Sequence, residues 1–153
     1  MIRRAVRAVL LDPDDRALLV QFREPETGFT FWATPGGGLD PGEMLEDGLR
    51  RELREEAGLE EFEPGPVIWT RREVFRWAGR TVDQRETFVL VRVPAFEVRP
   101  TVDLAAEDVH AHRWWTVDEI ETSDETIYPT RLASLLRDLL EQGPPAEPFD
   151  AGV

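Results

Sequence analysis

Residues 36–59, GGGLDPGEMLEDGLRRELREEAGL, constrain the fold of this chain more than any other segment. Three glycines open a loop, residues 41–57 are expected to form a helix, and Gly58 stands where helices commonly end. With an advance of about 100° per residue, three leucines share one face of this helix: Leu45, Leu49 and Leu53. The segment therefore predicts a glycine-rich loop followed by a helix that packs against a core.

The same helix carries three glutamates beside its apolar face. With Leu45 at 0°, Glu56 lies at about 20°, Glu52 at about −20° and Glu55 at about −80°. A glutamate-rich helix ordinarily presents its acids to water. Here Glu56 and Glu52 lie beside the leucines and not on the face expected to meet water. They are also like charges at i and i+4, which destabilise a helix by a few tenths of a kcal/mol. Their position near the C-terminal end also opposes the helix dipole.

Something cationic must therefore compensate these three acids. Clustered carboxylates with neither Cys nor His among them favour a hard cation, Mg²⁺ or Mn²⁺. Such ions keep several waters and usually bind through carboxylates together with the phosphates of a substrate. The pattern predicts that the acids hold a metal and that the metal holds a phosphate.

Strands and helices alternate around this segment. Turn residues and β-prone runs predict strands at 2–11, 16–23, 29–34, 67–77, 81–93 and 113–115, with an irregular loop at 94–112. Thr116 and Glu119 have capping-box spacing, and five leucines at helical spacing predict a helix within residues 132–140. This order predicts an α/β fold with a sheet between helices. We expect one domain over residues 1–142 and a Pro-rich, flexible tail over residues 143–153.

Composition excludes several classes of function. The formal net charge of −13 should repel nucleic acid polymers and anionic membranes, and also phosphorylated small molecules unless a metal cation intervenes. The chain has no apolar run of membrane-spanning length, and its first residues become charged too early for a signal peptide. A cysteine count of zero excludes disulfides, thiolate zinc sites and cysteine nucleophiles, and it fits a cytoplasmic protein.

Residues 37–59 resemble the Nudix box, G-x5-E-x7-R-E-U-x-E-E-x-G-U, in which U is a bulky aliphatic residue. All nine specified positions are filled: Gly37, Glu43, Arg51, Glu52, Leu53, Glu55, Glu56, Gly58 and Leu59. The order of elements is similar to that of a MutT-like Nudix domain, so the resemblance extends over most of the chain. It implies an α/β/α sandwich with a mixed sheet between helices. It also implies a pyrophosphohydrolase that hydrolyses a nucleoside diphosphate linked to another moiety.

The resemblance implies a metal site when it is carried over position by position. Glu52, Glu55 and Glu56 would be ligands of Mg²⁺ or Mn²⁺, together with the backbone carbonyl of Gly37. One of these glutamates would also orient or deprotonate water, and Arg51 would position the carboxylates by ion pairing. The expected reaction is in-line attack of a metal-activated water on phosphorus, with no covalent intermediate.

The resemblance also implies structural roles for the rest of the box. Glu43 would tie the loop to the helix, where an acid in the first turn also complements the dipole. Gly36 and Gly38, with the ligand glycine between them, would allow a loop conformation that side chains would block. Gly58 would end the helix.

Candidates outside the box each have two interpretations. Arg23 meets a substrate phosphate, as in similar Nudix enzymes, or pairs with a nearby surface acid. Trp32, Phe75 and Trp77 stack on a base or pack in the core, as large strand aromatics mostly do. Glu107, in the irregular loop, is an auxiliary ligand or base, as in some Nudix enzymes, or a solvated loop acid. Four arginines form a positive strip on the hairpin: Arg71, Arg72, Arg76 and Arg80. This strip binds a terminal phosphate of the substrate or balances the negative charge of the protein surface.

The sequence leaves the substrate open. Residues 74–77 stand where the resemblance would place a Pro in ADP-ribose hydrolases, or slightly beyond that a Tyr in dinucleoside polyphosphate hydrolases, and they contain neither residue. A catalytically silent Nudix-fold nucleotide sensor is the alternative function, although such modules usually lose box acids that are all present here. An isomerase of the isopentenyl diphosphate type would need a Cys. The expected partner is a small nucleotide-type diphosphate, and a homodimer is also open.

Overall fold

The computed structural model describes residues 2–153, apart from the side chains of Leu104 and Glu107. Its elements follow the chain in this order: β1 (Ile2–Leu11), β2 (Ala17–Arg23), β3 (Thr30–Ala33), β4 (Gly36–Gly38), α1 (Leu45–Ala57), β5 (Val67–Trp77), β6 (Arg80–Arg92), the 3₁₀ helix η1 (Leu104–Glu107), β7 (Val109–Trp115), α2 (Val117–Thr122), α3 (Leu132–Gln142) and β8 (Phe149–Asp150).

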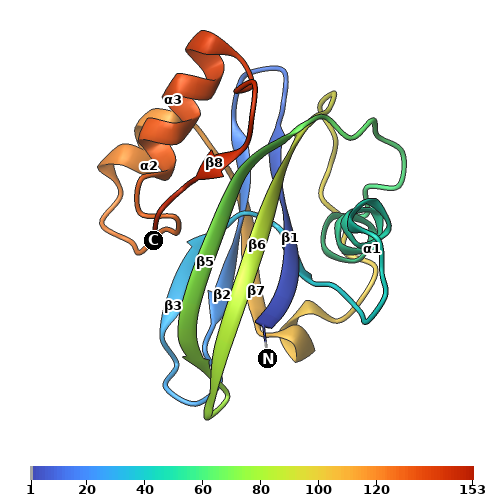
Figure 1. The fold of residues 1–153 in the computed structure, drawn as a ribbon, viewed down its shortest axis with the longest axis vertical. Coiled ribbons are helices and arrows are strands. Elements are labelled where there is room, and N and C mark those ends of the chain that lie inside the picture. Colours follow the sequence, from blue (N-terminus) through green and yellow to red (C-terminus); the bar gives the residue numbers. More distant parts are fainter. Residues whose placement is uncertain (1) are drawn as a thin grey trace.

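The strands form one mixed sheet. Its order is β3-β2-β1-β6-β5-β8, with β4 paired to β1 and β7 paired to β2. Strand β1 runs parallel to β6 from Ile2 opposite Asp83 to Leu11 opposite Arg92. Strands β5 and β6 form a long, curved antiparallel hairpin beside it (Figure 1). Strand β1 therefore lies in the centre of the sheet and contributes side chains to both of its faces.

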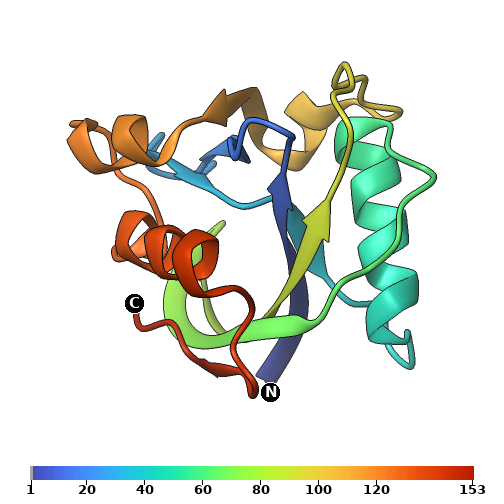
Figure 2. The same ribbon diagram turned by 90° about the horizontal axis from the view of Figure 1, so that it is seen from above.

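Helices cover both faces of this sheet. Helix α1 lies on one side, and α2 and α3 lie on the other (Figures 1 and 2). Leu10 of β1 belongs to the core cluster that contains Leu53 of α1. The next residue, Leu11, belongs to the cluster that contains Leu136 of α3. Full burial of one leucine contributes roughly 1.5–3 kcal/mol, so these contacts fix α1 against the sheet. The predicted α/β/α sandwich is confirmed.

Helix α1 begins four residues later than predicted. Residues 41–43 lie in a turn instead, in which the Glu43 amide donates to the Asp40 carbonyl at 2.9 Å. The Glu43 side chain also accepts from the Asp40 amide at 3.0 Å. These two bonds hold the chain in a turn before Leu45, so Glu43 lies outside the first helical turn. The prediction that it acts on the helix dipole from within that turn is wrong.

Two further segments are more ordered than expected. Strand β7 begins at Val109 instead of residue 113, because β2 pairs with it from Ala17 to Phe22 across a local irregularity. In the tail, β8 pairs parallel with β5, the Ala151 amide donates to the Thr70 carbonyl at 2.8 Å, and Ala151 is fully buried. The expectation of a flexible tail does not hold for residues 149–151.

Within the part of the chain that the structure describes, no helix combines the length and the apolar character needed to cross a membrane.

Candidate functional site

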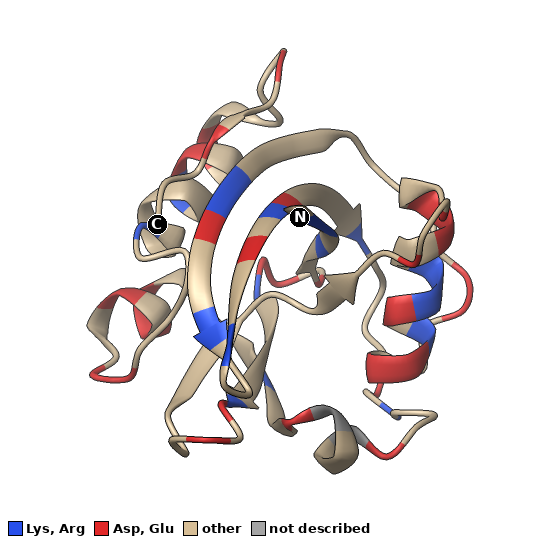
Figure 3. Cartoon of the chain, turned by 60° about the horizontal axis from the view of Figure 1, so that its bottom comes forward, with Lys and Arg blue, Asp and Glu red and all other residues tan. Residues whose placement is uncertain are grey.

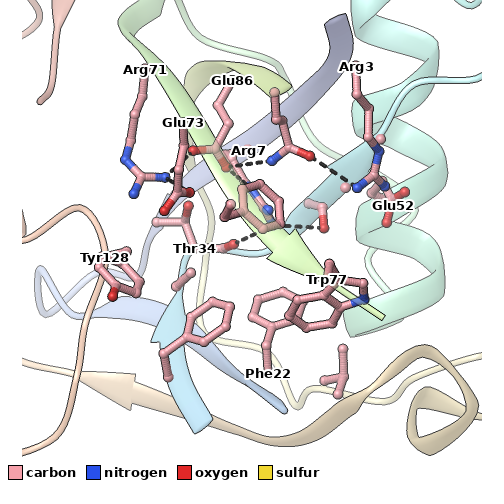
Figure 4. Close-up of a pocket in the computed structure, with 18 of the residues that line it drawn as sticks. Arg3, Arg7, Phe22, Thr34, Glu52, Arg71, Glu73, Trp77, Glu86 and Tyr128 are labelled. Atoms are coloured by element: carbon pink, nitrogen blue, oxygen red, sulfur yellow. Dashed lines mark hydrogen bonds and ion pairs between the residues drawn. The ribbon is translucent and has the colours of Figure 1, made fainter. Parts of the chain in front are cut away.

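A pocket of about 420 Å³ opens between α1, the glycine loop and the curved β5–β6 hairpin. Figure 3 shows both signs of charge along the curved hairpin and acidic positions on α1. One end of the pocket, termed here the acidic zone, consists of Gly36, Gly37, Gly38, Glu52, Glu55 and Glu56. The other end, the aromatic zone, consists of Phe22, Phe29, Phe31, Phe75, Trp77 and Tyr128. Arginines from β1 and β5 also line the pocket (Figure 4).

Glu56 is the most buried acid of the acidic zone. It is 3% exposed, and its Oε2 accepts from the Gly36 amide at 3.2 Å. Burial, followed by the negative charge of Glu52, raises the pKa of the Glu56 carboxyl well above its ordinary value, and Arg7 offsets part of this effect. Two carboxyls in such proximity need a shared proton or a cation to compensate their charges.

Glycines in the loop make room for Glu52. A Cβ on Gly37 would lie 2.7 Å from the Glu52 Oε1 atom, so a side chain at this position would displace the carboxylate. Gly36 has φ of +141°, and a Cβ there would lie 2.0 Å from the Val6 carbonyl oxygen. The loop therefore needs glycine at position 36 to pair with β1 and at position 37 to receive the acid.

Arg51 joins the loop to the helix. Its Nε and Nη2 donate to the two carboxylate oxygens of Glu43 at 3.0 and 2.8 Å. Its Nη1 donates to Glu52 at 2.9 Å, and its Nη2 also donates to the Gly38 carbonyl at 3.1 Å. The hydrogen bonds from Arg51, followed by the bond from the Asp40 amide, lower the pKa of Glu43 to about 2. Both box residues thus lie where they fix the Glu52 side chain and the glycine loop.

Glu55 lies in the same pocket and shares Arg51 with Glu52, at a longer distance. One of its carboxylate oxygens is 3.7 Å from Arg51 Nη1. Among the described residues, no group of three His, Cys, Asp or Glu side chains gathers in an arrangement that would hold a metal ion. The structure therefore brings Glu52 and Glu56 together with Gly37, while Glu55 lines the pocket beside them. The side chain of Glu107 lies outside the described residues.

A buried charge network crosses the pocket floor. Glu86 of β6 accepts from Arg7 Nε and from Arg71 Nη1, both at 2.6 Å, and its side chain is 4% exposed. Burial alone would raise the pKa of Glu86, but Arg7 and Arg71 together hold it below its ordinary value. Sequence reasoning missed this network. The available signal was Arg7 itself, a charged residue between apolar ones on a central strand.

The aromatic zone is centred on Phe31 of β3. Its ring lies 5.5 Å from the rings of Phe22 and Tyr128, and 6.2 Å from that of Trp77. The two hairpin aromatics for which base stacking and core packing were both open, Phe75 and Trp77, line the pocket. Phe22, Phe31 and Tyr128 were not predicted, because they come from separate segments that only the folded chain brings together.

Two other predicted substrate residues lie elsewhere. Trp32 is 7% exposed and packs in the core with its ring 5.2 Å from that of Trp115. Arg23 is exposed, near the turn at Gly28. Neither residue is among the described residues that line the pocket. Of the two interpretations open for Trp32, its position fits core packing and not stacking on a base.

Glu24 holds the tip of the β5–β6 hairpin beside the aromatic zone through hydrogen bonds. Its Oε1 accepts from the Ala78 amide at 2.8 Å, directly after Trp77. Its Oε2 accepts from the Thr27 and Glu26 amides at 2.6 and 2.9 Å. One carboxylate thus connects the β2–β3 turn to the β5–β6 turn and keeps Trp77 against Phe31.

Known proteins match this chain over most of its length. The model of the NUDIX domain matches residues 1–139. The nucleoside triphosphatase NudI of Salmonella paratyphi B is 28% identical over 142 residues, which cover 92% of this chain and 100% of the relative.

Solved structures share the fold. The MutT NUDIX hydrolase from Burkholderia pseudomallei superposes with a TM-score of 0.65 and 25% identity, over 90% of this chain and 97% of its own. The NUDIX domain of Shewanella oneidensis NrtR, complexed with ADP ribose, superposes with a TM-score of 0.67 and 22% identity, over 90% of this chain and 87% of its own. Together with the filled box at residues 37–59, the family match over most of the sequence shows that this chain belongs to the Nudix family and is a Nudix pyrophosphohydrolase.

Proposed function

We propose that this chain hydrolyses a phosphoanhydride bond of a small nucleotide in a reaction that depends on Mg²⁺ or Mn²⁺. The observation that carries the proposal is the pairing of the acidic zone with the aromatic zone in one pocket. Carboxylates suit a hard cation and its phosphate partner, whereas a set of aromatic rings suits a flat base. The net charge of −13 further supports a small substrate over a nucleic acid polymer.

The donor chemistry of the acidic zone suits a divalent cation, although Glu55 does not converge with Glu52 and Glu56 on one point in this structure. Glu52 and Glu56 are both buried, and their mutual repulsion raises the pKa of Glu56 beyond the effect of burial. Gly37 leaves the space that the Glu52 carboxylate fills. These two acids, with Glu55 and the Gly37 carbonyl, would hold the ion. When bound, it would neutralise phosphate charge and lower the pKa of a coordinated water.

The chain's own residues position the reacting groups. Arg51 fixes Glu52 at 2.9 Å, and the Gly36 amide fixes Glu56 at 3.2 Å, so both carboxylates keep their orientation. The aromatic zone holds the base, for which stacking on aromatic side chains contributes roughly 1–3 kcal/mol. One of the box glutamates then takes a proton from water as the water oxygen bonds to phosphorus. The bridging P–O bond breaks with its electron pair remaining on the leaving phosphate oxygen, and two phosphorylated products leave. Positioning and preorganised charge supply the rate enhancement.

Nucleoside triphosphates are the proposed substrate class. The similarity to NudI, whose name describes a nucleoside triphosphatase, spans 92% of this chain and supports this choice. ADP-ribose is the second candidate, because it occupies the superposable NrtR domain. Both carry a flat base and a diphosphate, as the two zones of the pocket require.

A hydrolysis panel tests the proposal. The purified chain is incubated with ribo- and deoxynucleoside triphosphates, ADP-ribose and nucleotide sugars, each with Mg²⁺, Mn²⁺ or EDTA, and the products are identified by mass. We expect release of a nucleoside monophosphate from at least one substrate, only in the presence of metal. Turnover that persists in EDTA would contradict the metal dependence. Tight binding without cleavage across the panel would instead favour a nucleotide sensor.

Removal of the Glu24 carboxylate is expected to raise KM more than it lowers kcat. In the variant Glu24→Ala the hairpin tip loses its link to the β2–β3 turn, so the substrate must order Trp77 when it binds. Ordering one such side chain costs about 0.5–1.5 kcal/mol, which predicts a rise in KM of roughly two- to tenfold.

The matched control for this prediction is Glu26→Ala, an exposed acid in the same turn. Steady-state kinetics on a cleaved nucleotide distinguish the two variants. A fall in kcat with unchanged KM for Glu24→Ala would show that the link acts on the chemical step and not on the aromatic zone.

A further inference from the structure

We propose that Arg3 forms an anion subsite that binds one phosphoryl group of the substrate, beside Gly38 in the acidic zone. The inference rests on the proposed function and adds a binding residue that the Nudix box does not contain. Arg3 lies in β1, ahead of the box in sequence, and its side chain lines the same pocket as Glu52. Figure 4 shows the two side chains at the same end of the pocket.

Gly38 provides the space in which the Arg3 guanidinium lies. The φ angle of Gly38 is not positive, so its backbone does not require glycine. A Cβ at this position would, however, lie 2.5 Å from both Nε and Nη2 of Arg3. The nearest obstacle to a side chain is therefore the guanidinium itself. Gly38 thus leaves room for the Arg3 guanidinium, as Gly37 leaves room for the Glu52 carboxylate. The loop therefore holds one cation and one acid side by side.

The charge of Arg3 is not neutralised by a neighbouring carboxylate. Arg7, Arg51 and Arg71 all line this pocket, and each has a carboxylate oxygen within 3 Å. For Arg3, no carboxylate lies within 4.0 Å among the described residues. Its Nη1 donates instead to the neutral amide oxygen of Gln84 at 3.1 Å. Among the described residues, Arg76 at the hairpin tip also lines the pocket without a carboxylate partner, and its Nη2 donates to the Gly79 carbonyl at 2.8 Å. Of the two, Arg3 is the cation that lies beside Gly38 in the acidic zone.

The remaining edge of the Arg3 guanidinium suits an oxyanion. Within the described chain, Nε and Nη2 of Arg3 make no hydrogen bond, and these two groups form one edge of the planar fork. Arg51 and Arg72 use this same edge in the structure to hold carboxylates, with both distances at 2.8–3.0 Å in each pair. Phosphate presents the same paired oxygens as a carboxylate. In this pocket the expected oxyanion is a phosphate, because the neighbouring acids are proposed to hold a metal–diphosphate group.

Equilibrium binding tests the subsite without turnover. Calorimetry measures the Kd of pyrophosphate and of a non-hydrolysable α,β-methylene nucleoside triphosphate, both with Mg²⁺, for the parent, Arg3→Gln and Arg3→Lys. The matched control is Arg4→Gln, which removes the same charge from the next, exposed residue. We expect Arg3→Gln to weaken binding of both probes roughly ten- to hundredfold, the range for a hydrogen bond to a charged group. Arg4→Gln is expected to remain within about twofold, and Arg3→Lys to lie between.

A double-mutant cycle of Arg3→Gln and Gly38→Ala tests whether the loss of binding arises where the Arg3 guanidinium contacts Gly38. The Cβ that Gly38→Ala adds displaces only the flexible end of Arg3, so the variant should fold and bind the probes as weakly as Arg3→Gln. Once the guanidinium is absent the Cβ has space, so the double variant should bind no more weakly than Arg3→Gln alone. Additive losses would contradict the proposed contact.

Other outcomes separate this inference from the proposed function. If Arg3 only balances the charge of Glu52, Arg3→Gln will shift the melting temperature and leave both Kd values unchanged, which would overturn the subsite. Absence of probe binding by the parent would overturn it as well. If the parent binds both probes but cleaves nothing in the hydrolysis panel, the proposed function fails while the Arg3 subsite is still decided by the Kd values.

Discussion

Replacement of Glu56 by Gln is expected to lower kcat by roughly 10²–10⁴-fold and to leave the fold intact. Glu56 is nearly fully buried in the acidic zone, where its charge is opposed by burial and by Glu52. Such a carboxylate is stable in the ionised form only with a compensating cation, which we propose is the metal. Gln keeps the size of the side chain and an oxygen that accepts from the Gly36 amide, but it removes the charge.

The sign of the stability change distinguishes this interpretation from a structural role. A carboxyl whose pKa is raised on folding makes the folded state less stable as the pH rises above its unfolded pKa. Without metal at neutral pH, Glu56→Gln should therefore be at least as stable as the parent in urea unfolding. The matched control is Glu46→Gln on the same helix, an exposed acid 3.6 Å from Arg50, which should change neither kcat nor stability appreciably. A variant at position 56 that folds and retains near-parental kcat would contradict the site.

The acidic zone could be predicted because its signal is local. Helical periodicity places Glu52 and Glu56 beside the leucines of one short segment, and both are buried in the structure. Residues 36–38 were expected to form a loop and instead pair with Ala5–Arg7 of β1 as a short strand. That pairing depends on a partner more than 25 residues away, so no local pattern contains it.

The rest of the pocket depends on contacts between distant segments. Arg7 and Glu86 are 79 positions apart, and they meet because β1 runs parallel to β6. An alternating strand pattern predicts which residues share a face, but it does not say which strands become neighbours. The same limit explains why Trp32 could not be separated from Trp77 in the sequence. Both are strand tryptophans, but Trp32 of β3 packs in the core and Trp77 at the end of β5 lines the pocket.

Replacement of Glu86 by Gln is expected to reduce the free energy of unfolding by about 3–5 kcal/mol, the range for breaking a buried ion pair. The change leaves the guanidinium groups of Arg7 and Arg71, 13% and 4% exposed, without the carboxylate that both contact at 2.6 Å. For a chain of this length the loss corresponds to a decrease in Tm of about 6–20 °C. Glu73→Gln is the matched control, because Glu73 also pairs with Arg71 but is 27% exposed and leaves Glu86 in place. Its effect on the free energy of unfolding should be about 1 kcal/mol or less.

The pH dependence of this difference tests whether the charge of Glu86 is responsible. Arg7 and Arg71 hold the pKa of Glu86 below its ordinary value despite burial, so the ionised carboxylate stabilises the folded state. Such a group contributes its full stabilisation above its unfolded pKa, which is about 4.3, and loses it as the pH falls through the lower folded value. In urea unfolding, the gap between the parent and Glu86→Gln should therefore be constant from about pH 8 to pH 5 and should narrow below about pH 4.3. A gap that remains constant into the acid range would mean that Gln destabilises through packing, and the buried ion pairs would then not be what holds the pocket floor together.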